Sequence, residues 1–387
     1  MKPTYSKIFL RKSSFENNIN FLRNNLIDRA TIVSFVVKGN AYGHGIQQMI
    51  PLAESFGIRH FSTFSADEAF LVDEASMAGS TVLIMGWIGT EDMKLVVEKE
   101  LEFQVFEIER LESALLWAKS FGKKARIHLE LETGMNRTGL NQQQLEKAVS
   151  IIRKNSEYIH LVGISTHLAG AECIANFVRV KNQINTFKKK EEWLQNEGVV
   201  PEIRHIASSA ACMNYPETQL DLVRSGIILY GLWPSVETKV TYLSKHRERQ
   251  KADPLERVIS WKSEVMSIKN IKQGEFVGYG TSFLASEDIT IAVIPVGYSY
   301  GYSRSLSNHS RVLIRGERLA VIGVVNMNML TVDITGYDNI KKGDEVVLIG
   351  SQGDLDISVS DFTQFSSQID YEMLSRLPMN ISRHLTD

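Results

Sequence analysis

Eight short apolar segments, each bounded by polar residues, recur along the first part of the chain. They are TIVSFVV, HFSTFS, TVLIMGW, EFQVFE, ARIHLELE, HLVGIST, IRHIASS and LVRSGIILYG. Most are separated by stretches typical of helices, such as ADEAFLVDEASMAG and QQQLEKAVSIIRKN. Eight strands alternating with helices over about 220 residues match the usual size of a (β/α)8 barrel. We therefore predict an α/β fold whose first domain, residues 1–240, is a TIM-type barrel.

The character of the sequence changes after this region. Residues 235–256 are polar and charged, which is typical of a solvated surface segment between domains. The sequence that follows is rich in strand-forming residues with Gly or Asp turns between them, as in RVISWKSEVMSI, GEFVGYGTSF, TIAVIPVGY, RVLIRGERLAVIGVV and MLTVDI. We predict a C-terminal, mainly β-strand domain over residues 241–387.

Composition narrows the class of protein. The chain has 387 residues, 43% of them hydrophobic, so it can bury a large core. Its net charge of −2 gives no field that would favour nucleic acid or an anionic membrane, and no apolar run approaches the roughly 18 residues of a membrane span. The N-terminus has no signal-peptide stretch, and Cys173 and Cys212 are too few for a disulfide framework or a cysteine metal cluster. We expect a cytoplasmic protein with no bound metal.

Chemically capable side chains gather where the predicted strands end. In VVKGNAYGHG, Lys38 leaves an apolar strand, where a lysine is out of place unless something satisfies it. The active site of a (β/α)8 barrel lies at the carboxyl ends of its strands. Other strands end near the following residues: Arg137, His167, Ser208, Ser209 and Arg224.

Each of these residues also has a structural explanation. His167 could be a hydrogen-bonded core histidine, Arg224 part of a structural ion pair, and the serines helix caps. Together, a lysine, two arginines, a histidine and hydroxyls at one barrel mouth would suit a small anionic ligand.

The segment VVKGNAYGHG closely resembles the one by which alanine racemases hold pyridoxal phosphate. The match continues in order, over nearly the whole chain, through ETGMNRTG, GISTHLA, HIASSAA, VRSGIILYGL, GYGTSF, GYSYGYSR and DYEMLSR. The resemblance implies a fold type III, pyridoxal-phosphate-dependent isomerase that interconverts L-alanine and D-alanine as a homodimer and supplies D-alanine for peptidoglycan.

The resemblance also implies roles for individual residues. Lys38 would bind the cofactor aldehyde covalently, and Arg224 would face the pyridine nitrogen. Because a guanidinium keeps its proton, it would leave that nitrogen unprotonated and the ring a poor electron sink, which favours reprotonation of the substrate. The remaining cofactor contacts that the family implies are Tyr42, His167, Ser209, Gly226, Ile227 and Tyr371.

Racemisation needs an acid/base group on each face of the α-carbon. By resemblance, Lys38 serves one face and Tyr279, from the neighbouring subunit, serves the other. A free phenol has a pKa of about 10, so the tyrosine needs cationic or hydrogen-bonding neighbours, which the family pattern assigns to His167 and Arg224.

Substrate handling is also implied by the family pattern. Arg137 and the backbone of Met327 match contacts to the substrate carboxylate. The matches to the narrow entrance are Tyr298, Arg304 and Tyr371.

Three positions depart from the family pattern and leave the substrate range open. Glu130 stands where many members have a carbamylated lysine, and its carboxylate would keep the negative charge that orients Arg137. Tyr300 replaces an acidic residue, and Asn328 replaces an aspartate.

Three other interpretations remain. The protein could be a racemase for serine or lysine. Related decarboxylases place an acidic residue at the pyridine nitrogen and a cysteine in the β domain, whereas this chain has Arg224 and no cysteine after Cys212. Barrel proteins that only carry pyridoxal phosphate end with the barrel, whereas here a second domain with Tyr279 follows.

Overall fold

The computed structural model describes residues 5–246, 252–364 and 369–387. The chain divides into two compact units. The barrel unit comprises Ser14–Lys38 and Met49–Glu256, and the strand unit comprises Met1–Ser13, Gly39–Gln48 and Arg257–Asp387. The boundary predicted from the sequence lies at residue 240. In the structure, the C-terminal segment of the strand unit begins at Arg257, and the unit also includes two segments from the N-terminal part of the chain.

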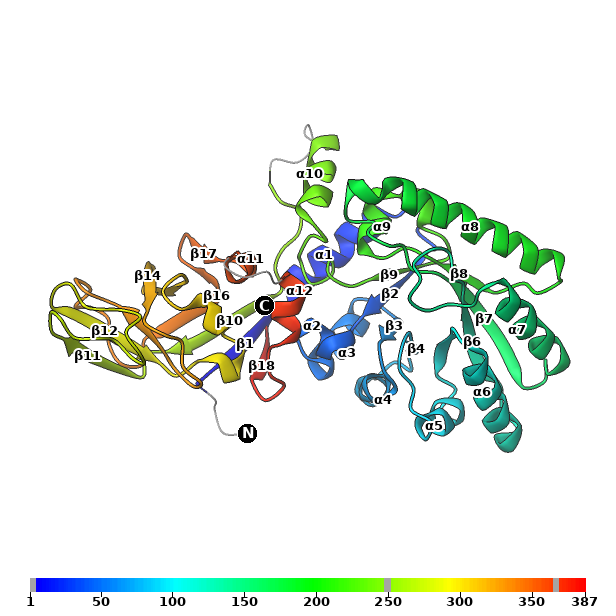
Figure 1. The fold of residues 1–387 in the computed structure, drawn as a ribbon, viewed down its shortest axis with the longest axis horizontal. Helices are drawn as coiled ribbons and strands as arrows, with labels where there is room; N and C mark the ends of the chain where they lie inside the picture. The colour runs from blue at the N-terminus through cyan, green and yellow to red at the C-terminus, as the bar shows by residue number, and fades with distance from the viewer. Residues whose placement is uncertain (1–4, 247–251, 365–368) are drawn as a thin grey trace. The chain divides into compact units, whose positions relative to one another are not determined.

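Eight parallel strands form the sheet of the barrel unit, in the order β8-β7-β6-β5-β4-β3-β2-β9. Their bounds are β2 Ile32–Val36, β3 His60–Thr63, β4 Thr81–Ile84, β5 Glu102–Val105, β6 Ala125–Glu130, β7 Ile159–Ser165, β8 Ile203–His205 and β9 Leu222–Ser225. A bridge between Ser208 and Arg224, and a hydrogen bond of 3.0 Å from the Arg224 N–H to the Ala207 carbonyl, join the edge strands. The result is a nearly closed barrel (Figure 1). Each predicted segment overlaps one strand, so the predicted barrel is confirmed.

Helices follow the strands along the chain, and Figure 1 shows α4 to α8 along the outer side of the sheet. The helices are α1 Lys12–Asn24, α2 Lys38–Tyr42, α3 Ile46–Ser55, α4 Ala66–Ala75, α5 Asp92–Glu98, α6 Ile108–Phe121, α7 Gln142–Lys154, α8 Phe177–Asn196, α9 Ser209–Asn214 and α10 Val236–Lys245. Local signals set some bounds, since Asn141 and Gln144 form a capping box at the start of α7. The predicted linker, residues 235–256, contains α10, and its residues 247–251 lie outside the described chain.

The two faces of the barrel strands differ in chemistry. Phe35 on β2 packs outward, with its ring centroid 5.3 Å from that of Phe15 on α1. The neighbouring Ser34 is fully buried and lies in register with His60 on β3 and Arg224 on β9. The sheet therefore presents apolar side chains to the helices and polar ones to the barrel interior, whereas branched aliphatic residues usually fill such interiors.

The strand unit is a mixed sheet in the order β11-β12-β15-β14-β13-β16-β10-β1-β18, with β17 paired to β16. Its strands are β1 Lys7–Arg11, β10 Ile259–Glu264, β11 Ser267–Ile271, β12 Ile289–Ile294, β13 Arg311–Ile314, β14 Glu317–Ile322, β15 Leu330–Asp333, β16 Glu345–Gln352, β17 Leu355–Ile357 and β18 Ser382–Thr386, and its helices within the C-terminal part are α11 Ser360–Thr363 and α12 Asp370–Ser375. The predicted β-rich domain is confirmed. Because β1 pairs antiparallel with β10 and parallel with β18, the first residues of the chain belong to this unit.

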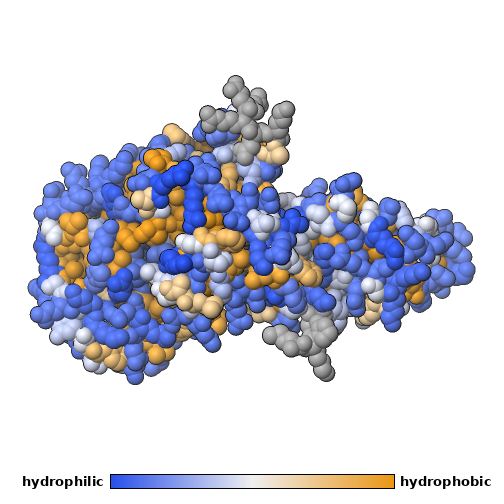
Figure 2. All heavy atoms as spheres, turned by 180° about the vertical axis from the view of Figure 1, so that it is seen from behind, coloured by the Kyte–Doolittle hydropathy of each residue, from blue (hydrophilic) through white to orange (hydrophobic). Residues whose placement is uncertain are grey.

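The surface is mostly polar. On the face shown in Figure 2, hydrophilic side chains cover most of the area, and apolar side chains gather in smaller patches between them. Among the described residues, no helix combines the length and the apolar character needed to cross a membrane.

The position of β1 leads to a prediction about stability. Leu10 is fully buried in β1, and truncating such a leucine leaves a cavity that typically costs about 2–5 kcal/mol. We expect Leu10→Ala to lower the free energy of unfolding in urea by that amount, and Arg11→Ala, at an exposed position of the same strand, to leave it nearly unchanged. Equal stability of the two variants would show that β1 is not part of the core.

Candidate active site

Lys38 stands at the point where the chain leaves β2 and enters a left-handed turn. Gly39 has φ 62°, and the three non-glycine residues 40–42 have φ 53°, 53° and 49°. Such a conformation costs about 1–2 kcal/mol for each non-glycine residue. The Asn40 side-chain oxygen accepts a hydrogen bond of 3.1 Å from the Ile46 N–H, which helps to hold the turn. Backbone strain of this kind gathers at functional sites.

The surroundings of the Lys38 amine favour its neutral form. Burial of the amine, followed by the cations Arg137 and Arg224, lowers its pKa, and Glu68 opposes the shift. The residue as a whole keeps access to solvent. A lysine with a lowered pKa has a larger fraction of the free amine, which is the form that attacks a carbonyl carbon. Lys38 is therefore suited to covalent bonding with an aldehyde.

Arg224 on β9 is a buried cation, with only 5% of its surface exposed. Its Nη1 donates to Nδ1 of His205 and, at 2.7 Å, to the His205 carbonyl, while its Nη2 donates to the Thr166 carbonyl at 2.8 Å. Burial lowers its pKa to about 10, against the effect of Glu130. Arg224 therefore remains protonated near neutral pH, and the predicted alternative of a structural ion pair does not describe these contacts.

His167, which follows β7, is electrically neutral near pH 7. Burial, and then the cations Arg224, Arg137 and Lys38, lower its pKa to about 3. A neutral imidazole cannot act as a cationic neighbour of a tyrosine. Any assistance from His167 to an acid/base group is therefore through hydrogen bonding.

A small set of hydroxyl and amide groups lies after β8 and β9. Ser208 caps α9 by accepting from the Ala211 N–H at 3.4 Å, as the helix-cap interpretation predicted. Ser209 Oγ instead accepts from the Gly226 N–H at 3.0 Å. The buried Ile227 N–H has no acceptor within hydrogen-bonding distance among the described residues. These groups resemble the donor sets that bind phosphate in proteins.

Glu130 ends β6 with its side chain buried. Its Oε1 accepts a hydrogen bond of 2.9 Å from the Thr138 hydroxyl, one residue after Arg137. Burial raises the pKa of Glu130, and Thr138, Arg224 and Arg137 oppose that shift. Arg137 itself is exposed on the loop after β6. The hydrogen-bond partner of Glu130 is thus the hydroxyl next to Arg137 in the sequence.

Other predicted site residues belong to the strand unit. Tyr42 and Tyr371 lie edge to face, with ring centroids 6.1 Å apart. Tyr279 has 73% of its surface exposed, on a loop between Gly278 and Gly280, which have φ 73° and 69°. Both glycines occupy the left-handed region, which other residues rarely adopt. The loop therefore presents the Tyr279 ring to solvent within this chain.

The positions around Met327 form a second group in the strand unit. The Met327 carbonyl accepts from the Ser299 N–H at 3.0 Å and from its hydroxyl at 2.7 Å, and Asn328 Oδ1 accepts from the same hydroxyl at 2.8 Å. Tyr300 hydrogen bonds through its hydroxyl to that of Tyr5. All three departures from the family pattern, at residues 130, 300 and 328, thus have side-chain hydrogen-bond partners. The predicted entrance residues Tyr298 and Arg304 are exposed on short helical turns, η3 Tyr298–Tyr300 and η4 Arg304–Leu306.

Three buried polar residues connected to Arg224 have no role predicted from the sequence, although His128 lies on the polar face of its strand. His205 contacts Arg224 directly, and His128 and Glu102 lie beyond it in the barrel interior. For Glu102 and His128, the signal is the alternation of polar and apolar residues in EFQVF and ARIHLE, which places every second side chain inside the barrel.

The fold and these residues define a class of protein, namely a (β/α)8-barrel enzyme with a β-strand unit and a cation-rich site at the carboxyl ends of its strands. The chain matches the family model of the N-terminal domain of alanine racemase over residues 10–234 and that of the C-terminal domain over residues 258–385. It therefore belongs to the alanine racemase family, and it is an isomerase.

Individual relatives agree with the family assignment. An alanine racemase of Leptospira interrogans is 33% identical over 388 residues, with 100% of this chain and 97% of that protein covered. One of Clostridium perfringens is 31% identical, with 99% and 95% covered. The solved structure of alanine racemase from Bacillus anthracis with bound L-Ala-P has a TM-score of 0.89 at 26% identity, with 100% and 96% covered.

The buried histidines lead to a prediction about acid stability. Burial lowers the pKa of His128 and His167, and that of His205 well below its usual value. An unfolded histidine has a pKa of about 6.5, so below that pH the unfolded state binds more protons than the folded state. Stability is therefore complete above about pH 6.5 and is lost as the pH falls, by up to about 1.4 kcal/mol per pH unit for each histidine.

Urea denaturation of the cofactor-free protein between pH 8 and 5 measures this loss of stability. This pH range lies above the one in which most carboxylates titrate, so their contribution is small. The free energy of unfolding should depend less steeply on pH in His167→Asn than in the wild type. The dependence should stay the same in His384→Asn, where the histidine is exposed. A free energy of unfolding that is constant over this range would contradict neutral buried histidines.

Proposed function

We propose that the protein is a pyridoxal-phosphate-dependent alanine racemase that interconverts L-alanine and D-alanine as a homodimer. The observation that supports this most is that Lys38, directly after β2, is close enough to Arg224 on the adjacent strand β9 for the arginine charge to help lower its pKa. One is an amine with a lowered pKa, and the other is a buried arginine that donates hydrogen bonds to an imidazole and two carbonyls.

The residues of the barrel unit fit the cofactor. Lys38 would hold it covalently through the aldehyde carbon, and the Ser209 hydroxyl with the amides of Gly226 and Ile227 would bind the phosphate. The Ile227 amide, which is buried and lacks an acceptor among the described residues, supports this assignment. When bound, pyridoxal phosphate acidifies the α-proton of an amino acid joined to its aldehyde carbon.

Arg224 would determine the type of reaction. With a pKa of about 10, it stays protonated near neutral pH. It can donate a hydrogen bond to a ring nitrogen but gives up its proton reluctantly, so that nitrogen stays neutral. A neutral ring withdraws fewer electrons from the substrate, which favours return of the α-proton over loss of carbon dioxide. The related decarboxylases require an acidic residue at this position.

Proton transfer would use two residues on opposite faces of the α-carbon. Lys38 would serve one face, and Tyr279 of the partner subunit would serve the other. The 73% exposure of Tyr279 within one chain is compatible with its use by a second copy. Since His167 is neutral, it would assist by orienting a hydroxyl rather than by lowering a phenol pKa through its charge.

The substrate carboxylate would be bound by Arg137 and by the Met327 N–H. Arg137 is exposed on the loop after β6, and the Met327 N–H has no acceptor among the described residues. A guanidinium binds a carboxylate through two parallel hydrogen bonds, which fixes the orientation of the α-carbon. Alanine is the main substrate that we propose, because the relatives described above are alanine racemases.

Mixing two inactive variants tests both the function and the shared site. Tyr279→Phe should lower kcat by about 10²–10⁴-fold, because the ring stays and only the proton-transferring hydroxyl is lost. Lys38→Ala should lose both activity and the visible absorbance of the covalently bound cofactor. An equal mixture should regain about a quarter of wild-type activity, because half of randomly formed dimers are hybrids with one complete site.

Native mass spectrometry of the mixture establishes how many hybrid dimers form. Hybrids without activity would contradict a site shared between subunits, whereas a wild-type protein that does not racemise alanine would contradict the function itself.

Glu130 leads to a separate prediction. If its charge orients Arg137, Glu130→Gln should raise KM by about 10- to 100-fold, which corresponds to the roughly 1.5–3 kcal/mol of a charge-assisted hydrogen bond. The change should appear in KM because Arg137 binds the carboxylate equally in the ground and transition states. Thr138→Val is the matched control, since it removes the hydrogen bond to Glu130 but keeps the charge. A lowered melting temperature with unchanged KM would assign Glu130 to stability alone.

A further inference from the structure

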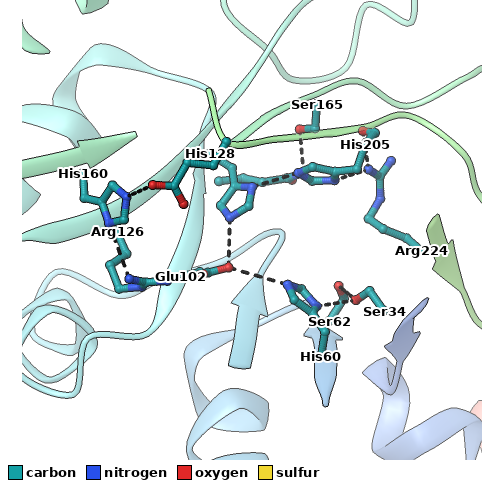
Figure 3. Close-up of polar contacts among 12 residues, drawn as sticks. Ser34, His60, Ser62, Glu102, Arg126, His128, His160, Ser165, His205 and Arg224 are labelled. Atoms are coloured by element: carbon teal, nitrogen blue, oxygen red, sulfur yellow. Dashed lines mark hydrogen bonds and ion pairs between the residues drawn. The ribbon is translucent and has the colours of Figure 1, made fainter. Parts of the chain in front are cut away.

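A continuous chain of hydrogen bonds runs through the barrel interior from Arg224 to Glu102 (Figure 3). Arg224 Nη1 donates to His205 Nδ1, His205 Nε2 lies 2.9 Å from His128 Nδ1, and His128 Nε2 lies 3.0 Å from Glu102 Oε2. The two histidines are fully buried, and Glu102 is 2% exposed. These hydrogen bonds connect side chains on four strands of the barrel, namely β9, β8, β6 and β5.

Arg224 at one end of this row of hydrogen bonds and Glu102 at the other determine which imidazole nitrogens of His205 and His128 carry a proton. Arginine has no acceptor, so His205 Nδ1 must be unprotonated and its proton must lie on Nε2. His128 Nδ1 must then accept, which leaves its own proton on Nε2, directed at Glu102. A carboxylate at that position accepts this proton. The arginine and the carboxylate therefore require the same tautomer of both histidines.

The side chains around Glu102 keep its carboxyl group negatively charged. Its Oε1 accepts a hydrogen bond of 2.6 Å from Arg126 Nη2, and His60 Nε2 lies 3.5 Å from its Oε2. Burial alone would raise the pKa of Glu102, but His128 and His60 more than offset it and hold the pKa well below its usual range. His60 is itself oriented by Ser34, whose hydroxyl lies 2.8 Å from His60 Nδ1. Glu102 is therefore an anion with a fixed orientation.

The backbone leaves room for these hydrogen-bonded side chains. A Cβ on Gly163 of β7 would lie 2.3 Å from His128 Nδ1, so any larger residue there would displace the imidazole. The pairing of β6 with β7 also shifts register between Ile127 and His128. Among the described residues, no group of histidine, cysteine and acidic side chains is arranged to hold a metal ion. Gly163 thus leaves the space that the imidazole of His128 occupies.

We propose that Glu102 is a positioning residue that acts on Arg224 through His128 and His205. Without its carboxylate, His128 can take either tautomer. In the tautomer with a proton on Nδ1, it no longer accepts from His205, which can then turn its own proton toward Arg224. Arg224 loses its acceptor, and a buried guanidinium with an unmatched donor changes its orientation. The consequence for catalysis rests on the proposed function, in which Arg224 faces the cofactor ring.

Two substitutions of Glu102 separate its hydrogen bond from a structural role. Glu102→Gln keeps an oxygen that accepts from His128, whereas Glu102→Leu keeps similar bulk but removes the acceptor. Glu54→Leu is the control for loss of a buried carboxylate, because Glu54 is 6% exposed and accepts from Ser76 and Ser80 rather than from a histidine. Gly163→Ala gives a second break that keeps Glu102, because its Cβ would lie 2.3 Å from His128 Nδ1 and 2.9 Å from the Ile203 carbonyl on β8.

The first measurement is the ¹⁵N NMR spectrum of the imidazoles in cofactor-free protein labelled at histidine. Wild type, Glu102→Gln and Glu54→Leu should show His128 and His205 protonated only on Nε2. Glu102→Leu and Gly163→Ala should show a mixture of tautomers at His205. A proton on Nδ1 of His205 in the wild type, or unchanged tautomers in the folded variants, would overturn the proposal. The wild-type spectrum can overturn the proposal even if one variant fails to fold, and the other variant then tests the role of Glu102.

The second measurement is the kinetics of the loaded enzymes. Glu102→Leu and Gly163→Ala should lower kcat by about 10- to 100-fold with little change in KM, and Glu102→Gln should restore most of the rate. A kcat equal to that of Glu54→Leu would assign Glu102 to stability and overturn the proposal. If wild type itself lacks racemase activity, the proposed function fails, whereas the tautomer of His205 still decides the claim about Glu102.

Discussion

The rest of the barrel depends on one buried cation, Arg224. Burying a charge is costly unless hydrogen bonds satisfy it. Here one imidazole nitrogen and two backbone carbonyls satisfy the guanidinium. An acceptor that is itself neutral keeps the arginine free to act on a ligand, because a carboxylate in direct contact would neutralise it. This requirement explains why the barrel interior holds histidines where aliphatic residues are usual.

The same strands also carry the stability of the barrel. Their outward side chains, such as Phe35, pack on helices, while the inward side chains next to them build the polar chain. Since the two faces alternate residue by residue, substitutions on one face affect packing and substitutions on the other affect electrostatics. The neutral histidines connect the two effects, because their burial makes the fold sensitive to acid and at the same time preserves the acceptor for Arg224.

Much of the fold could be predicted because the eight strands are short, apolar and separated by helical stretches. Lys38 could be predicted as a site residue because a charged side chain directly after a buried strand is unusual. The role of Glu102 could not be predicted, because the alternation in EFQVF indicates only that it faces the barrel interior and not that it meets His128 and His60 there. The N-terminal strand β1 was missed for a similar reason, since its partners β10 and β18 lie more than 200 residues away in the sequence. The hydrogen bond from Thr138 to Glu130 likewise depends on the backbone of a loop whose conformation the motif does not encode.

The products formed from L-alanine by the purified, cofactor-loaded enzyme test the central claim most directly. A protonated Arg224 at the cofactor ring predicts that D-alanine accumulates until the two enantiomers are equal, with only traces of pyruvate, ethylamine or carbon dioxide, and that alanine reacts faster than the other common amino acids. Chiral chromatography with parallel assays for the keto acid and the amine measures each product. Steady formation of pyruvate or ethylamine in amounts comparable with D-alanine, or faster racemisation of serine or lysine, would contradict the account.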